Sequence, residues 1–288
     1  MIKRIAKHLS RVSDVFWRNL RIERDIQVFP DDLFLTSFPR SGNTWIRFLV
    51  GNLMHQDEPV TFLNLERLVP DMYVHSDHAM RHLPRPRIIK SHECFDPRYK
   101  RVVYIARDPR DVAVSNYYWE LKKGSFPDGF PIQEFVPRWM ASEYWPRLGC
   151  WGDHITSWLS TRRSHPGFVL VRYEELKRDT ELELTKVARL LEIDPTPARL
   201  RRAVELSSAE RMRQLETSEG AKWVQTRYTR QDTPFVRKAS AGGWKSVLPP
   251  ESVALIEGTW GHLMLDLGYE LTTEHPVQAL ASRIKQYE

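Results

Sequence analysis

Residues 36–45, Thr-Ser-Phe-Pro-Arg-Ser-Gly-Asn-Thr-Trp, combine side chains that can bind a phosphate group. Arg40 brings a positive charge, and Ser41 and Thr44 offer hydroxyl donors. Gly42 permits a close approach of the backbone. Where such a segment joins a strand to a helix, unpaired N–H groups and the positive end of the helix dipole also favour an anion. The segment therefore indicates an anion site, although an ordinary strand-to-helix turn with a capping serine has the same features.

The motif G-x-x-x-x-G-K-[ST], with which kinases and ATPases cradle polyphosphate and place magnesium, is absent from the sequence. We therefore expect the loop to hold a phosphate group without a metal. A nucleotide kinase of related fold remains the alternative enzyme.

A second chemical group lies in Lys90-Ser91-His92. An imidazole can take a proton near neutral pH, so His92 is a candidate general base. On an extended chain Lys90 projects to the same side as His92, two positions away. The alternatives are a core or surface histidine and a solvated lysine at the end of a strand.

Three motifs together resemble those of the PAPS-dependent sulfotransferases; PAPS is 3′-phosphoadenosine 5′-phosphosulfate, and PAP is the product. Residues 36–45 are similar to the family's 5′-phosphosulfate loop, roughly [YF]-P-[KR]-S-G-[TN]-T-W. Residues 90–92 are similar to K-[TS]-H, and residues 107–115 to R-[ND]-[PA]-[KR]-D-x-x-x-S. Weaker matches follow in the family's order, so the likeness covers about residues 32–272: they lie at 149–154, 173–176, 208–212 and 237–245.

The resemblance implies a role for each matching residue. His92 would be the catalytic base, Lys90 would neutralise the sulfuryl oxygens, and Arg40 would hold the 5′-phosphate and the bridging oxygen. Arg107 and Ser115 would bind the 3′-phosphate. No metal is implied. The other residues of the implied PAPS site are Ser41, Gly42, Asn43, Thr44, Trp45, Tyr173, Ser208, Arg237 and Lys238.

Four positions depart from the family pattern. Arg40 stands where the best-known cytosolic members have Lys, and a guanidinium acts as an electrostatic clamp rather than as a proton donor. Ala209 replaces a Phe that stacks on adenine, and Ala239 replaces a Gly. Gly243 replaces an Asp. These changes bear on how firmly PAPS is held.

Short apolar runs alternate with helical patterns along the chain, which argues for a parallel sheet with covered faces. We predict strands at 33–37, 87–90, 102–106 and 168–171, and helices at 43–55, from about 110, and at 174–191. With the resemblance, the predicted fold is a single α/β, P-loop-like domain whose central parallel sheet has helices on both faces.

Residues 117–151 are rich in aromatic side chains, which could line a pocket for an apolar or sugar acceptor. For most of them, packing under a helical lid is the better interpretation. The ten are Tyr117, Tyr118, Trp119, Phe126, Phe130, Phe135, Trp139, Tyr144, Trp145 and Trp151.

His75, His78 and His82 would share one side of a helix, but no Cys or HExxH motif accompanies them. With prolines nearby, we interpret this segment as a loop at the acceptor mouth rather than as a metal site.

The net charge of +6 favours an anionic ligand, but residues 1–25 supply +4 of it, with seven Lys or Arg and three Asp or Glu. A nucleic-acid surface across the fold is therefore not expected. We interpret 1–25 as an amphipathic basic helix packed on the domain, with membrane-surface contact as the less favoured alternative, and 26–288 as the sulfotransferase domain. With two cysteines and no apolar signal segment, we expect a cytoplasmic enzyme.

The sequence thus predicts in-line transfer of the sulfuryl group of PAPS to a hydroxyl of a small molecule, a sugar or a lipid. A PAPS-binding module without catalysis is the alternative from another class, and no oligomeric state is indicated.

Overall fold

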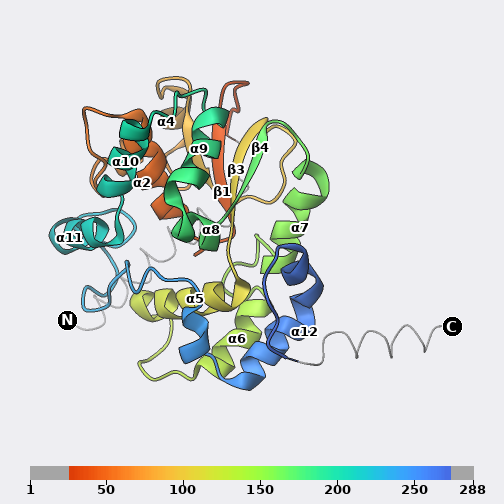
Figure 1. Cartoon of the computed structure of the whole chain (residues 1–288). Helices are drawn as coiled ribbons and strands as arrows, with labels where there is room; N and C mark the ends of the chain where they lie inside the picture. Colours follow the sequence, from red (N-terminus) through yellow and green to blue (C-terminus); the bar gives the residue numbers. More distant parts are fainter. Residues whose placement is uncertain (1–25, 274–288) are drawn as a thin grey trace.

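The computed structural model describes residues 26–273, and within them four parallel strands form one sheet in the order β2-β1-β3-β4 (Figure 1). The strands are β1 (Leu33–Ser37), β2 (Ile88–Ser91), β3 (Arg101–Ala106) and β4 (Phe168–Arg172). The register pairs Leu33 with both Ile88 and Arg101, which places the first residues of the three strands side by side. The carboxyl ends of the strands therefore reach the same edge of the sheet.

Helices cover both faces of the sheet. In Figure 1, α2, α9 and α10 lie beside the strands, and α5, α6 and α12 gather below them. The helices are α2 (Asn43–Met54), α3 (Leu65–Leu68), α4 (Asp77–Arg81), α5 (Pro109–Lys123), α6 (Ile132–Met140), α7 (Trp151–Arg162), α8 (Tyr173–Arg178), α9 (Thr180–Leu190), α10 (Pro197–Leu206), α11 (Ala209–Glu219) and α12 (Pro250–Asp266), with a 3-10 turn η1 (Gly243–Ser246).

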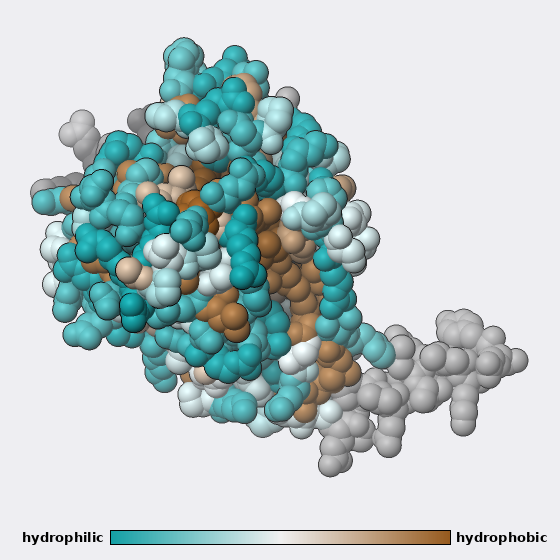
Figure 2. Space-filling view, turned by 45° about the horizontal axis from the view of Figure 1, so that its top comes forward, coloured by the Kyte–Doolittle hydropathy of each residue, from teal (hydrophilic) through white to brown (hydrophobic). Residues whose placement is uncertain are grey.

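Alternation along the strands divides the core into two clusters. Leu33 and Leu35 of β1 join the cluster built with α2, α9 and α10, whereas Phe34 between them joins the cluster of α5, α6, α7 and α12. Both kinds of position are almost fully buried. The prediction of an α/β domain with a parallel sheet covered on both faces is therefore confirmed. On the surface, the face in Figure 2 is mostly hydrophilic, with hydrophobic side chains gathered in a band across its middle.

The prediction of one helix at 174–191 is wrong, because the structure has two helices there, α8 and α9. Asp179 lies between α8 and α9 with φ −144° and ψ 85°, and its carboxylate accepts a hydrogen bond from the Leu182 N–H at 3.0 Å. An Asp at this position caps the new helix and ends the continuous hydrogen-bond ladder.

The segment around His78, which we interpreted as a loop, contains the short helix α4. Ser76 caps the short helix α4, and the His78 and His82 rings lie 4.4 Å apart, while His75 Nε2 lies 3.0 Å from the Glu66 carbonyl oxygen. No cluster suited to a metal ion occurs among residues 26–273. The predicted basic helix at 1–25 lies outside the described residues, as do residues 274–288.

Candidate active site

Each of the four strands is followed, at its carboxyl end, by residues that the sequence predicts in the site. The anion loop follows β1, His92 follows β2, Arg107 follows β3, and Tyr173 follows β4. In a parallel sheet these ends converge on one crevice, which is where such folds bind ligands. The topology therefore brings together motifs that are up to 137 residues apart, from Thr36 to Tyr173.

The turn into α2 leaves the helix end open. Gly42 is the N-cap residue with φ 103°, no side chain among residues 26–273 caps the first turn, and that turn has no acidic residue. A Cβ on Gly42 would lie 2.7 Å from the Tyr173 ring, so both the dihedral angle and the contact require glycine. The uncapped N–H groups and the positive helix end are therefore available to an anion.

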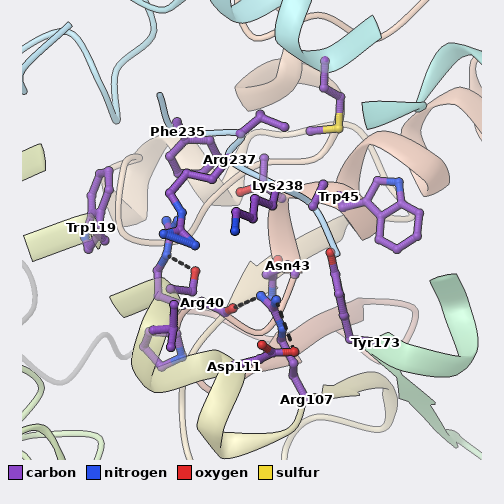
Figure 3. Close-up of a pocket in the computed structure, with 18 of the residues that line it drawn as sticks. Arg40, Asn43, Trp45, Arg107, Asp111, Trp119, Tyr173, Phe235, Arg237 and Lys238 are labelled. Carbon is purple, nitrogen blue, oxygen red and sulfur yellow. Dashed lines mark hydrogen bonds and ion pairs between the residues drawn. The ribbon is translucent and has the colours of Figure 1, made fainter. Parts of the chain in front are cut away.

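A cavity of about 200 Å³ lies against this turn (Figure 3). In Figure 3, Trp119 and Phe235 stand on one side, Trp45 and Tyr173 on the other, and the cationic side chains lie between them. Of the residues predicted in the site, those that line the cavity are Arg40, Gly42, Asn43, Thr44, Trp45, Lys90, His92, Arg107, Ser115, Tyr173, Arg237 and Lys238.

Two predicted residues, Ser41 and Ser208, are not among those lining the cavity. The Ser41 hydroxyl is buried and has no hydrogen-bond partner among the described residues. Ser208 is exposed and caps α11, where its hydroxyl accepts from the Arg211 N–H at 3.2 Å. Ala209 and Met212, on the helix that Ser208 caps, face the cavity instead.

The hydrogen bonds of His92 fix its tautomer. Nδ1 lies 2.6 Å from the Ser37 carbonyl oxygen, which can only accept, so Nδ1 carries the proton and donates it. Nε2 is then the unprotonated nitrogen that can accept one. Burial first, and then the Lys90 ammonium, hold the pKa of His92 well below its usual value of 6.5. The imidazole is therefore neutral at physiological pH and suited to act as a base.

The backbone of His92 is held as well. Its N–H donates to the Tyr73 hydroxyl at 3.0 Å, and its carbonyl accepts from His154 Nε2 at 3.0 Å. His154 itself is fully buried, and its Nδ1 accepts from the Tyr104 hydroxyl at 2.8 Å. His154 thus supports the position of His92 without reaching the cavity.

Arg40 and Ser115 lie together, although the resemblance assigns them to opposite ends of PAPS. Arg40 Nε lies 3.3 Å from Ser115 Oγ, and the guanidinium packs 5.0 Å from the Trp119 ring and 4.7 Å from the Phe235 ring. Burial first, and then the charges of Arg107 and Arg237, lower the pKa of Arg40. Three guanidinium groups at one cavity favour an anionic ligand that can relieve their repulsion.

Arg107 spans the two sides of the predicted 3′-phosphate site. It donates to the Arg40 carbonyl and to the Ser240 carbonyl, each at 3.2 Å, and its guanidinium lies 4.2 Å from the centre of the Tyr173 ring. Its Nε is buried without a hydrogen-bond partner among the described residues. A buried donor without a partner is costly, and an oxyanion in the cavity would satisfy it.

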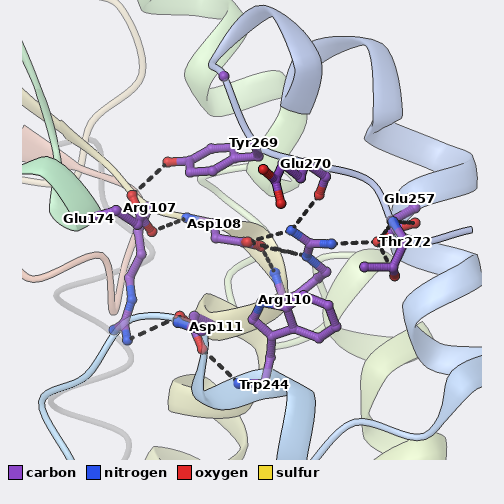
Figure 4. A network of polar contacts seen from close by, with 12 residues as sticks. Arg107, Asp108, Arg110, Asp111, Glu174, Trp244, Glu257, Tyr269, Glu270 and Thr272 are labelled. Atoms are coloured by element: carbon purple, nitrogen blue, oxygen red, sulfur yellow. Dashed lines mark hydrogen bonds and ion pairs between the residues drawn. The ribbon is translucent and has the colours of Figure 1, made fainter.

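The rest of the Arg107–Ser115 segment builds the support of this site (Figure 4). Arg110 pairs with Asp108 at 2.6 Å and with Glu257 of α12 at 2.5 Å. Asp111 accepts from the N–H groups of Gly242 and Trp244 at 2.7 and 2.9 Å. The segment therefore connects the end of β3 to α12 and to residues 237–245, here called the late loop, and holds Arg107 between them.

The late loop closes the cavity from the other side. Arg237 lies 3.6 Å from the centre of the Tyr118 ring, and Arg237 and Lys238 both line the cavity. Ala239 follows with φ 51°, in the left-handed region that favours glycine. A glycine would adopt this conformation without strain, whereas Ala239 adopts it at some cost in strain.

Several residues that line the cavity were not predicted from the sequence. Asp111 lies inside a recognised motif, and Lys177 directly follows the Tyr173–Leu176 match, so proximity to a motif could have indicated both. Asp71 and Gln225 also line the cavity, but no pattern in the sequence points to them.

The aromatic segment contributes little to the cavity wall. Of its ten aromatic residues, only Trp119 and Trp145 line the cavity. Phe135, Trp139 and Trp151 are almost fully buried in the core, and the others pack against it.

The parallel sheet, the open helix end and the cation-lined cavity define an α/β protein whose cavity suits an anionic ligand. The sequence matches the family described as "Sulfotransferase domain" over residues 30–268, and the chain therefore belongs to the sulfotransferase family. The prediction of a sulfotransferase enzyme is confirmed, and the nucleotide kinase alternative is wrong.

The relatives agree with this assignment. Sulfotransferase 1B1 of Mus musculus is 30% identical over 242 residues, which cover 78% of this chain and 80% of the mouse protein. Mouse sulfotransferase SULT7A1, solved in complex with PAP, has a similar fold with a TM-score of 0.67 and 19% identity over 94% of both chains. Retinol dehydratase, solved with retinol and PAP, has a TM-score of 0.69 and 17% identity, covering 90% of this chain and 87% of its own.

Among residues 26–273, no helix has the length and apolar character needed to cross a bilayer. Cys94 and Cys150 are both free thiols.

Proposed function

We propose that this sulfotransferase transfers the sulfuryl group of PAPS in line to the hydroxyl of an alcohol, phenol or sugar, with His92 as general base. The observation that carries the proposal is the tautomer of His92: its free Nε2 belongs to a residue that lines the same cavity as the open end of α2 and the arginine cluster. PAP in the solved complexes of SULT7A1 and retinol dehydratase supports PAPS as donor, and retinol in one of them supports a hydroxyl acceptor.

Different residues would bind the different charged groups of PAPS. Arg107, whose Nε has no hydrogen-bond partner among residues 26–273, suits the 3′-phosphate together with Ser115. Arg237 and Lys238 line the same cavity from the late loop. The N-terminus of α2 suits the 5′-phosphosulfate, and Arg40, whose Nε lies 3.3 Å from Ser115 Oγ in this structure, would turn from Ser115 to reach it. Trp45 and Tyr173, whose ring centroids lie 5.6 Å apart, suit adenine.

Transfer requires one proton acceptor and stabilisation of the leaving group. Nε2 of His92 takes the proton of the acceptor hydroxyl as its oxygen bonds to sulfur, while the bond from sulfur to the bridging oxygen breaks. The Ser37 carbonyl stabilises the imidazolium that forms, because it accepts from Nδ1. Negative charge grows on the departing 5′-phosphate oxygen, where Arg40 and the helix end favour it. Catalysis is then mainly positioning and electrostatics.

The test is incubation of the purified chain with sulfur-35-labelled PAPS and a cell extract, followed by identification of the labelled product. We expect a labelled small molecule from the wild-type chain, and labelling slower by about 10²- to 10⁴-fold from His92→Ala. A chain that binds PAP but labels nothing would instead be a PAPS-binding module without catalysis. A chain that does not bind PAP at all would contradict the proposed donor.

A cytoplasmic location is part of this proposal, supported by the two free thiols and the likeness to the curated sulfotransferases.

A further inference from the structure

Lys90 is paired with a buried carboxylate that no motif indicates. Its Nζ lies 2.8 Å from Asp71 Oδ2, and the Asp71 side chain is only 1% exposed. Both residues line the cavity that contains His92. The ammonium also lies 5.0 Å from the centre of the Tyr73 ring. Asp71 therefore binds one side of the Lys90 ammonium, and Lys90 still lines the cavity.

The backbone fixes Asp71 beside Lys90. The two residues form a parallel bridge at the edge of the sheet. The Lys90 N–H donates to the Pro70 carbonyl at 2.8 Å, and the Met72 N–H donates to the Lys90 carbonyl at 3.2 Å. Hydrogen bonds on both sides of Asp71 prevent the carboxylate from moving away from the lysine.

Two further donors hold the carboxylate itself. The Tyr73 N–H donates to Oδ1 at 2.9 Å, and Gln225 Nε2 donates to Oδ2 at 2.7 Å. Gln225 comes from the segment between α11 and the late loop, which is distant in sequence. Asp71 is thus satisfied independently of Lys90, and its orientation is set before a ligand binds.

The charged and titratable groups that face Lys90 are Asp71, Arg47 of α2, Glu66 of α3 and the His92 imidazole, with the Tyr73 ring beside them. Arg47 and Glu66 pair with each other at 2.9 Å. Burial lowers the pKa of Lys90, and Asp71 is the largest influence that raises it again. Without that carboxylate, burial and Arg47 would favour the neutral amine.

We propose that Asp71 is a positioning residue that keeps the Lys90 ammonium charged and at the cavity wall, where it meets the sulfuryl oxygens of the donor, and that Gln225 holds Asp71 in place. This inference rests on the proposed function. It concerns the transfer step, because Lys90 meets the sulfuryl group of PAPS and not the part of the donor that remains as PAP.

The test is a double-substitution cycle with Asp71→Asn and Lys90→Met, read as single-turnover release of label from sulfur-35-labelled PAPS to 4-nitrophenol or to water. For Asp71→Asn we expect turnover to fall about 10- to 100-fold, with PAP affinity within about threefold of wild type. The loss of activity at high pH should begin about one pH unit lower, because the ammonium loses its proton more readily. Asp71→Glu should restore part of the pH profile.

In the Lys90→Met background, Asp71→Asn should change turnover less than about twofold, because the ammonium that Asp71 positions is absent. Asp96→Asn is the matched control: it removes a carboxylate from the loop after β2 that pairs with Arg98 and does not line the cavity. If Asp71→Asn does not fold, Gln225→Leu carries the test, with a smaller shift in the same direction at high pH and a loss of about three- to tenfold.

An unchanged pH profile in Asp71→Asn, or in Gln225→Leu if only that variant folds, would overturn the inference. So would an equal loss from Asp71→Asn with and without Lys90. Neither outcome contradicts the proposed function, because the wild-type enzyme still turns over PAPS in both. A wild-type chain that neither binds PAP nor releases label would overturn the proposed function instead.

Discussion

We propose that the cavity has a donor side and an acceptor side, and the two are built in different ways. On the donor side, the loop at 36–45 and the segment at 107–115 follow the ends of neighbouring strands. On the acceptor side, most of the aromatic residues at 117–151 are in or against the core, and only two line the cavity. A fixed pattern of charges demands fixed backbone positions, whereas apolar packing can be met by many side chains. The first kind of site therefore leaves motifs in a sequence and the second does not.

Substitutions on the donor side are also expected to cost more free energy than those on the acceptor side. Arg110 pairs with Asp108 and Glu257, all of them buried, so removing one partner would leave an uncompensated charge. Around the acceptor side, contacts such as the stacked rings of Phe135 and Tyr144, 4.9 Å apart, tolerate changes of volume better. We therefore expect substitutions on the donor side to have larger effects.

The largest effect is expected for His92→Ala. Loss of a positioned general base should lower kcat by about 10²- to 10⁴-fold while PAP affinity stays within about twofold. Steady-state kinetics and calorimetric titration with PAP would check this. His78→Ala, at an exposed histidine on α4, is the matched control and should leave both quantities unchanged. Loss of PAP affinity in His92→Ala would place the imidazole in binding rather than in proton transfer.

The pH dependence of the wild type should follow the same residue. Because the pKa of His92 is lowered, the neutral base is present throughout the range above 6.5 and is lost only as pH falls through the lowered value. We expect kcat to be level from pH 8 to about 6.5 and to fall about tenfold per unit below the His92 pKa. A fall that begins above pH 7 would contradict the neutral, buried imidazole.

Arg107→Ala should come next, with a loss of about 10²-fold in PAP affinity, because it removes charge-assisted hydrogen bonds to a phosphate. Titration with AMP, which lacks the 3′-phosphate, separates the two ends of the ligand. Wild type should prefer PAP over AMP strongly, and Arg107→Ala should lose most of that preference. Arg178→Ala, at an exposed arginine of α8 that pairs with Glu175, is the control. An unchanged preference would move the 3′-phosphate elsewhere.

On the acceptor side, Trp145→Ala should raise the acceptor KM about tenfold through lost apolar contact, with PAP affinity unchanged. Initial rates at varied acceptor concentration would measure it. Tyr144→Ala removes a neighbouring ring that does not line the cavity, and should leave the KM unchanged. Equal effects from the two substitutions would mean that packing, not contact with the acceptor, governs this side.

The sequence could predict the sheet and most of the cavity because both depend on local patterns. Short continuous apolar runs define the strands, and the residues after their ends form the site. The motif at residues 90–92 indicates both His92 and Lys90 as residues of the site. The break at Asp179 was missed because its capping bond outweighs a helical pattern that continues across it.

What the sequence could not predict depends on contacts between distant segments. Asp71 reaches Lys90 only because a non-strand segment adds to the edge of the sheet, and Gln225 arrives from beyond α11. Ser208 does not line the cavity for the opposite reason: its hydroxyl has a local use, because it caps α11. A motif identifies the segment that approaches a ligand but not every side chain that reaches it.

The smallest effect we expect comes from Ala239→Gly, which tests how far the donor side tolerates a departure from its motif. Ala239 has φ 51°, where a Cβ costs about 1 kcal/mol, but glycine adds freedom to the unfolded chain that offsets part of the gain. Unfolding free energy should therefore rise by less than about 1 kcal/mol, measured by urea denaturation. PAP affinity should improve about two- to threefold, because Arg237 and Lys238 immediately precede the relieved residue. Ala221→Gly, outside the loop, should improve neither quantity. If Ala239→Gly weakens PAP binding, rigidity of the late loop matters more than its strain, and the donor side would depend on preorganisation as well as on charge.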